Sequence, residues 1–261
     1  MDEEKKVTAL YDLAKMPTTF DFAAWAVIAK THGANHARFV FEGEIACWKY
    51  PDYVAWKRFG NILIPISLLA RMTFSVGPRT DGIEVPYMIG DVEKYYKRYG
   101  KIRKLKPITE VTESGYVTIT IRESFRNRYR NSNVPAWQKF AEYLDKRQIR
   151  VVVFPECEQT PIDILHRMKM YAGADMNLGV NCGPMTLCLY SDAPYIMLNM
   201  CPVNNTGERT YDMRKLLDGC GFTEGSQFSF RNDKQFIVWE PDTYENIVRA
   251  YEQVTEQKAA A

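Results

Sequence analysis

Residues 116–154, YVTITIRESFRNRYRNSNVPAWQKFAEYLDKRQIRVVVF, have the pattern of a strand, a loop, a helix and a second strand. The β-branched run at 116–121 predicts a buried strand, and the apolar run at 150–154 predicts a strand covered on both faces. Between them, apolar residues recur on one face of a predicted helix at 134–147: Val134, Trp137, Phe140, Ala141 and Leu144. This order is that of the parallel βαβ unit of α/β proteins.

The same alternation extends over the whole chain. Strands are expected at 7–13, 37–43, 72–77, 116–121, 150–154, 176–180, 194–199 and 235–240. Helices are expected at 20–30, 50–70 with a break near Pro65, 90–100, 134–147, 161–172, 183–191, 210–220 and 242–254. Residues 101–115 have no apolar period and many charges, which predicts a linker. We therefore expect an α/β protein with two Rossmann-like lobes and parallel sheets, formed by residues 1–108 and 109–261.

The composition is that of an ordinary globular protein. The 261 residues are 46% hydrophobic and 25% charged, and a net charge of +2 creates no global field for nucleic acid or membranes. The opening residues lack the apolar core of a signal peptide, and the longest apolar run, 62–70, is too short to span a bilayer. We expect a cytoplasmic protein. The cysteines form no C-x-x-C pair and are not spaced with the histidines as zinc ligands, so no metal site is expected.

A basic loop follows the strand at 116–121. Residues 122–133 contain four arginines, three asparagines and two serines. Open α/β sheets bind ligands at the carboxyl ends of their strands, and guanidinium groups hold phosphate oxygens bidentately. The loop thus predicts a diphosphate site made by Arg122, Ser124, Arg126, Arg130 and Asn131. The alternative is a solvated loop face. We expect Asn131, Ser132 or Asn133 to cap the next helix, with Pro135 in its first turn.

A second candidate site follows the strand at 176–180, in the sequence Asn181-Cys182-Gly183-Pro184. Gly183 allows a ligand to approach the backbone, and Pro184 suits the first position of a helix. Amide groups at the start of that helix would bind an anion. An ordinary tight turn between a strand and a helix would explain the same residues.

The run VNCGPMTLCLYSDAPYIML, at 180–198, resembles the strand–loop–helix–strand of GT-B glycosyltransferases, especially their heptosyltransferase-like branch. There a D-T-G-P-M-H-L-A type turn presents backbone amides to the donor diphosphate. Four residues match the pattern: Gly183, Pro184, Met185 and Leu187. Three depart from it: Asn181, Cys182 and Thr186 stand where the family has Asp, Thr and His. TTFDFAAWAVIA and FGNILIPISLLAR are also similar to a little-characterised group of bacterial proteins assigned as glycosyltransferases.

The resemblance implies an enzyme that needs no metal or other cofactor. It would move a sugar from a nucleotide-diphosphate donor, bound by the second lobe, to a glycan or lipid-linked acceptor, bound by the first. The helix dipole and basic side chains would neutralise the leaving diphosphate. The turn residues Asn181, Cys182, Gly183, Pro184, Met185 and Thr186 would then contact the donor.

Two carboxylates are candidates for roles in this reaction. Asp21 begins the first helix, where the resembling enzymes have an Asp, and is the candidate catalytic base. The simpler interpretation is an Asp stabilised by the helix dipole. Glu156 follows a strand of the second lobe and could contact the nucleotide ribose, or be a solvated acid.

Two other function classes stay open on the sequence alone. A basic run at 94–106, interleaved with tyrosines, suits nucleic acid, or an anionic membrane that carries a lipid-linked acceptor. The near-neutral net charge argues against specific nucleic-acid binding. A protein that binds a nucleotide without turnover is also compatible with these residues. No G-x-G-x-x-G follows a strand, which argues against a dinucleotide-dependent dehydrogenase.

Overall fold

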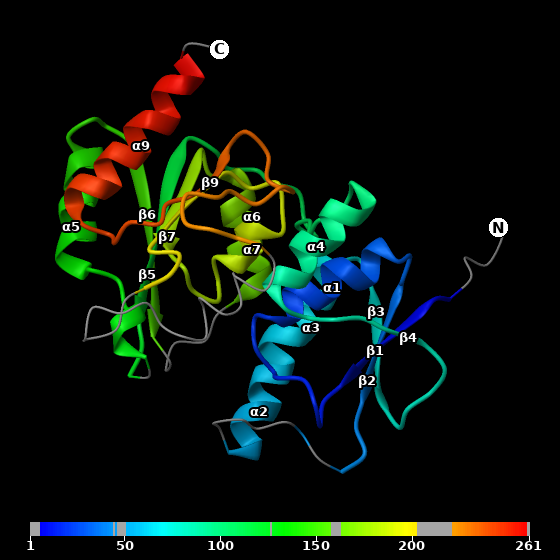
Figure 1. Ribbon diagram of the computed structural model, residues 1–261. Coiled ribbons are helices and arrows are strands. Elements are labelled where there is room, and N and C mark those ends of the chain that lie inside the picture. Colours follow the sequence, from blue (N-terminus) through cyan, green and yellow to red (C-terminus); the bar gives the residue numbers. More distant parts are fainter. Residues whose placement is uncertain are drawn as a thin grey trace.

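The computed structural model describes residues 6–43, 45, 51–125, 127–157, 163–202 and 221–259. Within them the chain forms two parallel β-sheets flanked by helices (Figure 1). The strands of the first sheet lie within residues 8–84 and those of the second within 116–237, and we call the parts built on them the first and second lobe. The predicted α/β fold with two Rossmann-like lobes and parallel sheets is confirmed. The boundary between residues 108 and 109 stays a prediction.

The first lobe has a four-stranded sheet in the order β3-β2-β1-β4. Its strands are β1 (Thr8–Asp12), β2 (His36–Val40), β3 (Thr73–Gly77) and β4 (Ile83–Glu84). Its helices are α1 (Phe22–Thr31), α2 (Asp52–Arg58), α3 (Ile64–Leu69) and α4 (Ile89–Tyr99). An aromatic cluster fills the space between β1, β2 and α1, with ring centroids 4.8–6.1 Å apart: Tyr11, Phe22, Trp25 and Phe39. These buried rings supply a large share of the apolar area removed from water.

The break predicted near Pro65 is a π-helical turn at Phe59–Leu63, between α2 and α3. Pro65 lies in the first turn of α3. A proline ring clashes with the carbonyl four residues earlier in a regular α-helix, and the wider turn relieves that clash. The helical segment therefore continues through the proline instead of ending at it.

The second lobe has a five-stranded sheet in the order β6-β5-β7-β8-β9. Its strands are β5 (Tyr116–Glu123), β6 (Arg150–Cys157), β7 (Met176–Val180), β8 (Tyr195–Leu198) and β9 (Gln235–Ile237). Its helices are α5 (Val134–Asp145), α6 (Ile164–Gly173), α7 (Thr186–Leu189) and α9 (Tyr244–Ala259), with a short 3-10 turn at Arg128–Arg130. Figure 1 shows α5 and α9 packed together on one side of the sheet and α6 with α7 on the other. The helix predicted at 210–220 lies outside the described residues.

β6 differs from its prediction. The prediction of a strand covered on both faces is wrong, because Val153 is 49% exposed. β6 also lies at the edge of the sheet. The apolar run VVVF looks like a central strand because residue type reports β-propensity and not the position of a strand in the sheet. β5, whose residues Tyr116 to Ile121 are buried, is an interior strand with β6 on one side and β7 on the other.

The two lobes are joined along a seam. The predicted linker has no helix or strand between residues 101 and 115, and Leu105 is buried in it. The Leu105 amide donates to the Tyr190 carbonyl of the second lobe at 2.7 Å, and the Lys106 amide donates to the Leu69 carbonyl of the first at 3.0 Å. Backbone hydrogen bonds thus fix this segment to both lobes. No helix within the described part of the chain is long and apolar enough to cross a membrane.

A second contact across the seam involves a buried carboxylate. Glu93 of α4 is 1% exposed and accepts hydrogen bonds from the amide of Ser229 at 3.0 Å and from its hydroxyl at 2.6 Å. Lys97 lies 3.2 Å from the same carboxylate. Because a buried carboxylate needs several donors, this cluster ties α4 to the loop before β9.

Candidate functional site

The strand order of the second sheet creates a switch point between β5 and β7. The chain passes from β5 outward to β6 and then returns to β7 on the other side of β5. The connections that leave β5 and β7 therefore diverge, and open α/β sheets bind ligands in the crevice at such a point, beyond the carboxyl ends of the strands. The loop at 122–133, here called the arginine loop, follows β5, and the turn at Asn181 follows β7. Both predicted anion motifs thus meet at one place.

Side chains of the arginine loop hold its own backbone. The Arg122 amide donates to Ser132 Oγ at 2.8 Å, and the Ser132 amide donates to the Arg122 carbonyl at 2.9 Å. Asn131 Oδ1 accepts from the Arg122 guanidinium and from the Ser124 amide, and its Nδ2 donates to the Ser124 carbonyl at 3.0 Å. This network explains why the loop is rich in Asn and Ser as well as Arg. The loop is a built structure rather than a solvated face alone.

The end of the arginine loop is fixed by Asp242, a residue that no sequence pattern singles out. Its Oδ2 accepts from the Asn133 amide and from the Trp137 indole, both at 2.7 Å. Asn133 caps α5 and Pro135 lies in its first turn, as predicted. Burial raises the pKa of Asp242 above its usual range, although the hydrogen bonds from Asn133 and Trp137 oppose that shift. In the sequence Asp242 looks like an ordinary residue before the last helix, so its long-range partners appear only in the fold.

Arg130 connects the arginine loop to the turn after β7. Its Nη2 donates to the Asn181 carbonyl at 3.1 Å. Its Nε is buried and has no hydrogen-bond acceptor among the described residues. Asn181 is itself held, since its amide donates to the Leu198 carbonyl at 3.1 Å and its Nδ2 to the Met200 carbonyl at 2.8 Å. A guanidinium group with an unused donor therefore lies at the switch point, on a well-supported turn.

The turn after β7 differs from its prediction in one respect. α7 begins at Thr186 and contains four residues, so Pro184 precedes the helix instead of occupying its first position. The Thr186 amide and hydroxyl both donate to the Gly183 carbonyl, at 3.0 and 2.7 Å. A helix this short has little macrodipole. An anion bound here would depend mainly on guanidinium groups and not on the helix N-terminus.

Packing between the lobes explains why residue 183 is a glycine, which the sequence did not reveal. A Cβ atom built on it would lie 2.5 Å from Cδ2 of Phe20 in the first lobe, so the glycine allows the lobes to touch. Cys182 and Met185 are 3% and 0% exposed, which makes them core residues. Pro184 is buried as well. The half-buried residues of the turn are Asn181, Gly183 and Thr186.

Asp21 lies where the first lobe meets this turn. It follows Phe20 directly, its side chain is exposed, and its Oδ2 accepts a hydrogen bond from Thr19 Oγ1 at 2.7 Å. Burial and then the nearby Asp21 carboxylate raise the pKa of Tyr190 in the second lobe, and the same two causes raise the pKa of Tyr87 in the first. The candidate base therefore lies at the boundary of the lobes, close to two phenols. Both tyrosines were missed because the sequence contains sixteen, with no pattern that marks these two.

Two predicted residues are not placed by the structure. Arg126 lies outside the described residues. Glu156 is paired with Arg122 in the β5–β6 register, but its side chain is not among those described. In the described part of the chain, no three His, Cys, Asp or Glu side chains gather as metal ligands would.

The basic run at 94–106 is partly engaged in ion pairs. Lys97 Nζ lies 3.2 Å from Glu93 Oε1, and Lys104 Nζ lies 3.1 Å from Asp192 Oδ1. These two cations are therefore partly neutralised by the protein itself.

No protein-family model and no curated protein matches the chain. Solved structures do resemble it. Two are of TibC, described as a dodecameric iron-containing glycosyltransferase from enterotoxigenic E. coli H10407 and as a heptosyltransferase in complex with ADP-D-beta-D-heptose; they are 12% and 13% identical, with TM-scores of 0.39 and 0.42. Each match covers 76% of this chain, which spans 60% of the TibC chain.

A third structure is the E. coli heptosyltransferase WaaC with ADP, 10% identical, with a TM-score of 0.48 over 96% of this chain and 99% of WaaC. TibC and WaaC are both described as heptosyltransferases.

Proposed function

We propose that the chain is a glycosyltransferase that moves a sugar from a nucleotide-diphosphate donor to a hydroxyl acceptor. The donor diphosphate would bind where β5 and β7 end. The observation that carries the proposal is the 3.1 Å hydrogen bond from Arg130 Nη2 to the Asn181 carbonyl, because it joins the arginine loop and the turn at the switch point of a parallel sheet. Arg122, Ser124 and Asn131 complete the donor site on one side, and Gly183 and Thr186 border it on the other.

The chemistry of the donor explains the guanidinium groups. Breaking the bond between sugar and diphosphate leaves negative charge on the diphosphate, and fixed cations stabilise that charge in the transition state. With α7 limited to four residues, Arg122 and Arg130 would carry most of this role. The buried Nε of Arg130 supports the proposal, since an unpaired buried donor costs free energy that a phosphate oxygen would offset. In this proposal the reaction needs no metal, and chelators leave its rate unchanged.

Asp21 would act on the acceptor. A general base must lie within hydrogen-bond reach of the hydroxyl that attacks the sugar. Asp21 is exposed, it adjoins Phe20, and Phe20 lies against the turn at Gly183, so the carboxylate would lie beside the proposed donor site. The half-buried Tyr87 is protonated at neutral pH, and burial and Asp21 raise its pKa further; a protonated phenol can donate to sugar hydroxyls. A glycan or lipid-linked acceptor, with peripheral membrane contact through the basic run at 94–106, is part of this proposal.

The first experiment is a thermal-shift screen with UDP, GDP, ADP and CMP, a panel that includes the nucleotide present in the WaaC structure. A ligand that binds only the folded state raises the melting temperature by mass action. We expect one nucleoside diphosphate to raise it, and Arg130→Ala to abolish the shift. Arg128→Ala is the matched control, because Arg128 is exposed in the same 3-10 turn. No shift with any nucleotide, or equal loss in both variants, would contradict the donor site.

If a nucleotide binds, a turnover assay distinguishes a glycosyltransferase from a protein that only binds the nucleotide. Release of the nucleoside diphosphate from its sugar conjugate, in the presence of acceptor, establishes transfer. Binding without release for every donor and acceptor tried would support a non-catalytic nucleotide-binding protein. That alternative uses the same arginine loop and predicts no effect of Asp21.

A further inference from the structure

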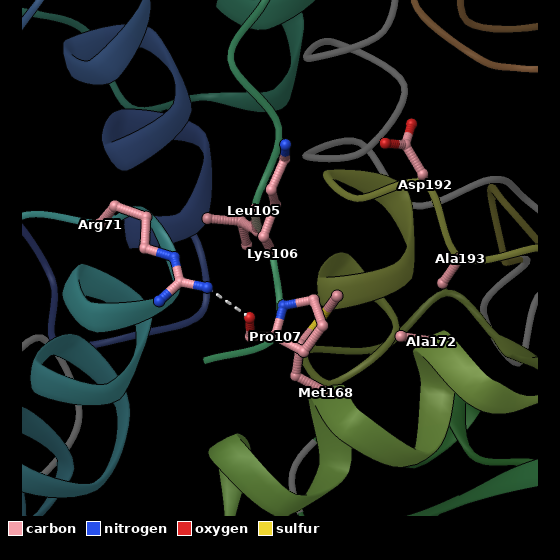
Figure 2. A pocket seen from close by; sticks show the side chains of 8 residues that line it. All are labelled: Arg71, Leu105, Lys106, Pro107, Met168, Ala172, Asp192 and Ala193. Atoms are coloured by element: carbon pink, nitrogen blue, oxygen red, sulfur yellow. Dashed lines mark hydrogen bonds between the residues drawn. The ribbon is translucent and has the colours of Figure 1, made fainter. Parts of the chain in front are cut away.

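A cavity lies along the seam between the lobes, away from the proposed donor site. It has a volume of about 340 Å³ and is bounded by Arg71 of the first lobe, by residues 105–107 of the linker, and by Met168 and Ala172 of α6. Figure 2 shows the linker running through the centre of this region, with Arg71 on one side and Met168 and Ala172 on the other. The cavity exists only because the two lobes and the linker meet there. Its size falls within the range of small-molecule sites.

The cavity and the proposed donor site lie at opposite ends of the strands. Arg71 comes just before β3, and Ala193, which also lines the cavity, comes just before β8. The donor-site residues follow the ends of β5 and β7. In parallel sheets all strands begin at one edge and finish at the other, so the seam cavity lies on the amino-terminal side. A ligand here would not compete directly with the donor.

The walls of the cavity combine apolar surface with unpaired positive charge. The half-buried Pro107 and Ala172 supply the accessible apolar part, and Leu105 and Met168 lie behind them, each 1% exposed. Lys106 is exposed and, among the described residues, neither it nor Arg71 has a carboxylate partner. Asp192 is the one acidic residue in the lining, and it is 3.1 Å from Lys104. The lining therefore suits a ligand with a negative head and a short apolar chain.

Arg71 has an unusual backbone for its residue type. It follows α3 with a φ of 56°, in the left-handed region where glycine or asparagine is the usual choice at a helix end. A residue with a Cβ is strained there by about 1–2 kcal/mol. The side chain compensates in part, because Nη2 donates to the Pro107 carbonyl at 2.7 Å (Figure 2). Strained residues of this kind are found at ligand sites, where a side chain in a fixed position has a use.

A neighbouring cavity extends the same chemistry. It has a volume of about 620 Å³, shares Arg71 as a wall, and adds Lys6 with the apolar side chains of Leu68 and Ile108. Lys6, like Arg71, has no ion-pair partner in the described part of the chain. Arg71 therefore lines two cavities, and the walls of each combine apolar and cationic side chains.

We infer that the seam cavity beside Arg71 and Lys106 binds an anionic amphiphile, a carboxylate or phosphate monoester on a short alkyl chain. The anionic head would contact Arg71 and Lys106, and the chain would lie against Pro107 and Ala172. Because the walls come from both lobes and the linker, the bound ligand would favour the arrangement in which the lobes touch. This inference is independent of the proposed function.

The test is isothermal titration of the full chain with octanoate and with octyl phosphate, each below its micelle concentration. We expect saturable binding of at least one of them, and at least tenfold weaker binding of octanol and of inorganic phosphate. Comparing the affinities of octanoate and octyl phosphate shows whether the site prefers a carboxylate or a phosphate head group. Binding of inorganic phosphate as tight as that of octyl phosphate would show that the alkyl chain contributes nothing, and would overturn the inference of an amphiphilic ligand. No saturable binding of either anion would overturn the site.

Two variants change the cavity by different routes. Lys106→Ala removes charge, and Ala172→Leu fills the apolar end; we expect each to weaken binding at least fivefold. Lys101→Ala is the matched control, since Lys101 is an exposed linker lysine that does not line the cavity. An equal loss with Lys101→Ala would show a non-specific charge effect and overturn the inference. The nucleotide thermal shift should be unchanged in Lys106→Ala, so failure here and failure of the donor site are distinguishable.

Discussion

Arg130 and Asn181 are fifty-one positions apart in the sequence, and a hydrogen bond of 3.1 Å joins the guanidinium Nη2 of the first to the carbonyl of the second. The bond spans the switch point of the second sheet, where the connections after β5 and β7 diverge. It brings the charge of one motif to the backbone of the other. A close turn without charge, or a charged loop without support, would each be weak evidence for a ligand. Their contact is stronger evidence, because neither an ordinary turn nor a solvated loop requires a hydrogen bond between the two.

The packing of Gly183 against Phe20 leads to a stability prediction. Gly183→Ala would place a Cβ 2.5 Å from Cδ2 of Phe20, and relieving that contact should cost about 1–3 kcal/mol of unfolding free energy. The backbone of Gly183 has no positive φ, so the cost is one of space. Urea unfolding measures it. Gly60→Ala is the control, because a Cβ there meets nothing within 4 Å.

A double-mutant cycle shows whether Phe20 is the cause. With Phe20→Ala present, Gly183→Ala should become nearly neutral, since the ring that it strikes is absent. If the two changes are additive, the contact between the lobes is not what requires glycine at this position.

Two buried tryptophans give a matched comparison of a satisfied and an unsatisfied indole. Trp137 Nε1 donates to Asp242 at 2.7 Å, whereas the Nε1 of Trp25 is buried without an acceptor among the described residues. Both side chains are at most 1% exposed. Trp137→Phe should be more destabilising than Trp25→Phe by about 1–3 kcal/mol, because it leaves the buried Asp242 carboxylate with one donor fewer. Chemical denaturation of both variants decides this, and equal losses would refute it.

How far the sequence predicts this protein depends on the range of the interactions involved. Strand and helix periodicity is local, so the βαβ pattern of residues 116–154 led to the right fold class. The edge position of β6 and the contact of Gly183 with Phe20 depend on partners distant in the chain, and no local pattern encodes them. The same holds for the site. The arginine loop could be recognised by composition, but Asp242, Tyr87 and Tyr190 enter only through tertiary contacts.

The burial of His36 leads to a prediction of how the free energy of unfolding depends on pH. It is 5% exposed on β2, and its ring nitrogens lie 2.8 Å from Thr73 Oγ1 and 2.8 Å from Ser75 Oγ. Burial, followed by the positive charges of Lys6 and Arg38, lowers the pKa of His36 below its usual value. The unfolded chain therefore binds this proton at a higher pH than the folded one does. Stability is complete above the unfolded pKa and decreases as pH falls from about 6.5 toward the folded value.

The measurement is the free energy of unfolding in urea between pH 5 and pH 8, for the wild type and for His36→Gln. A single group changes that free energy by at most about 1.4 kcal/mol per pH unit. The wild type should lose more stability than the variant as the pH falls through this range. His32→Gln is the control, since His32 is an exposed histidine of the same lobe. Equal pH dependence in the wild type and in His36→Gln would contradict the assignment.

Asp21 allows binding and chemistry to be separated. Its carboxylate is exposed and accepts from Thr19 Oγ1 at 2.7 Å, a bond that the amide oxygen of Asn can also accept. Asp21→Asn should therefore leave the fold and the nucleotide thermal shift unchanged while it removes the proposed base. General base catalysis contributes about 10²–10⁴-fold, so kcat for sugar transfer should fall at least a hundredfold. Asp91→Asn is a matched control, because Asp91 also contributes to the raised pKa of Tyr87 and Tyr190 but serves as a helix-start residue of α4. If transfer survives in Asp21→Asn, or if nucleotide binding falls with it, Asp21 is only a residue of the helix start and another residue is the base.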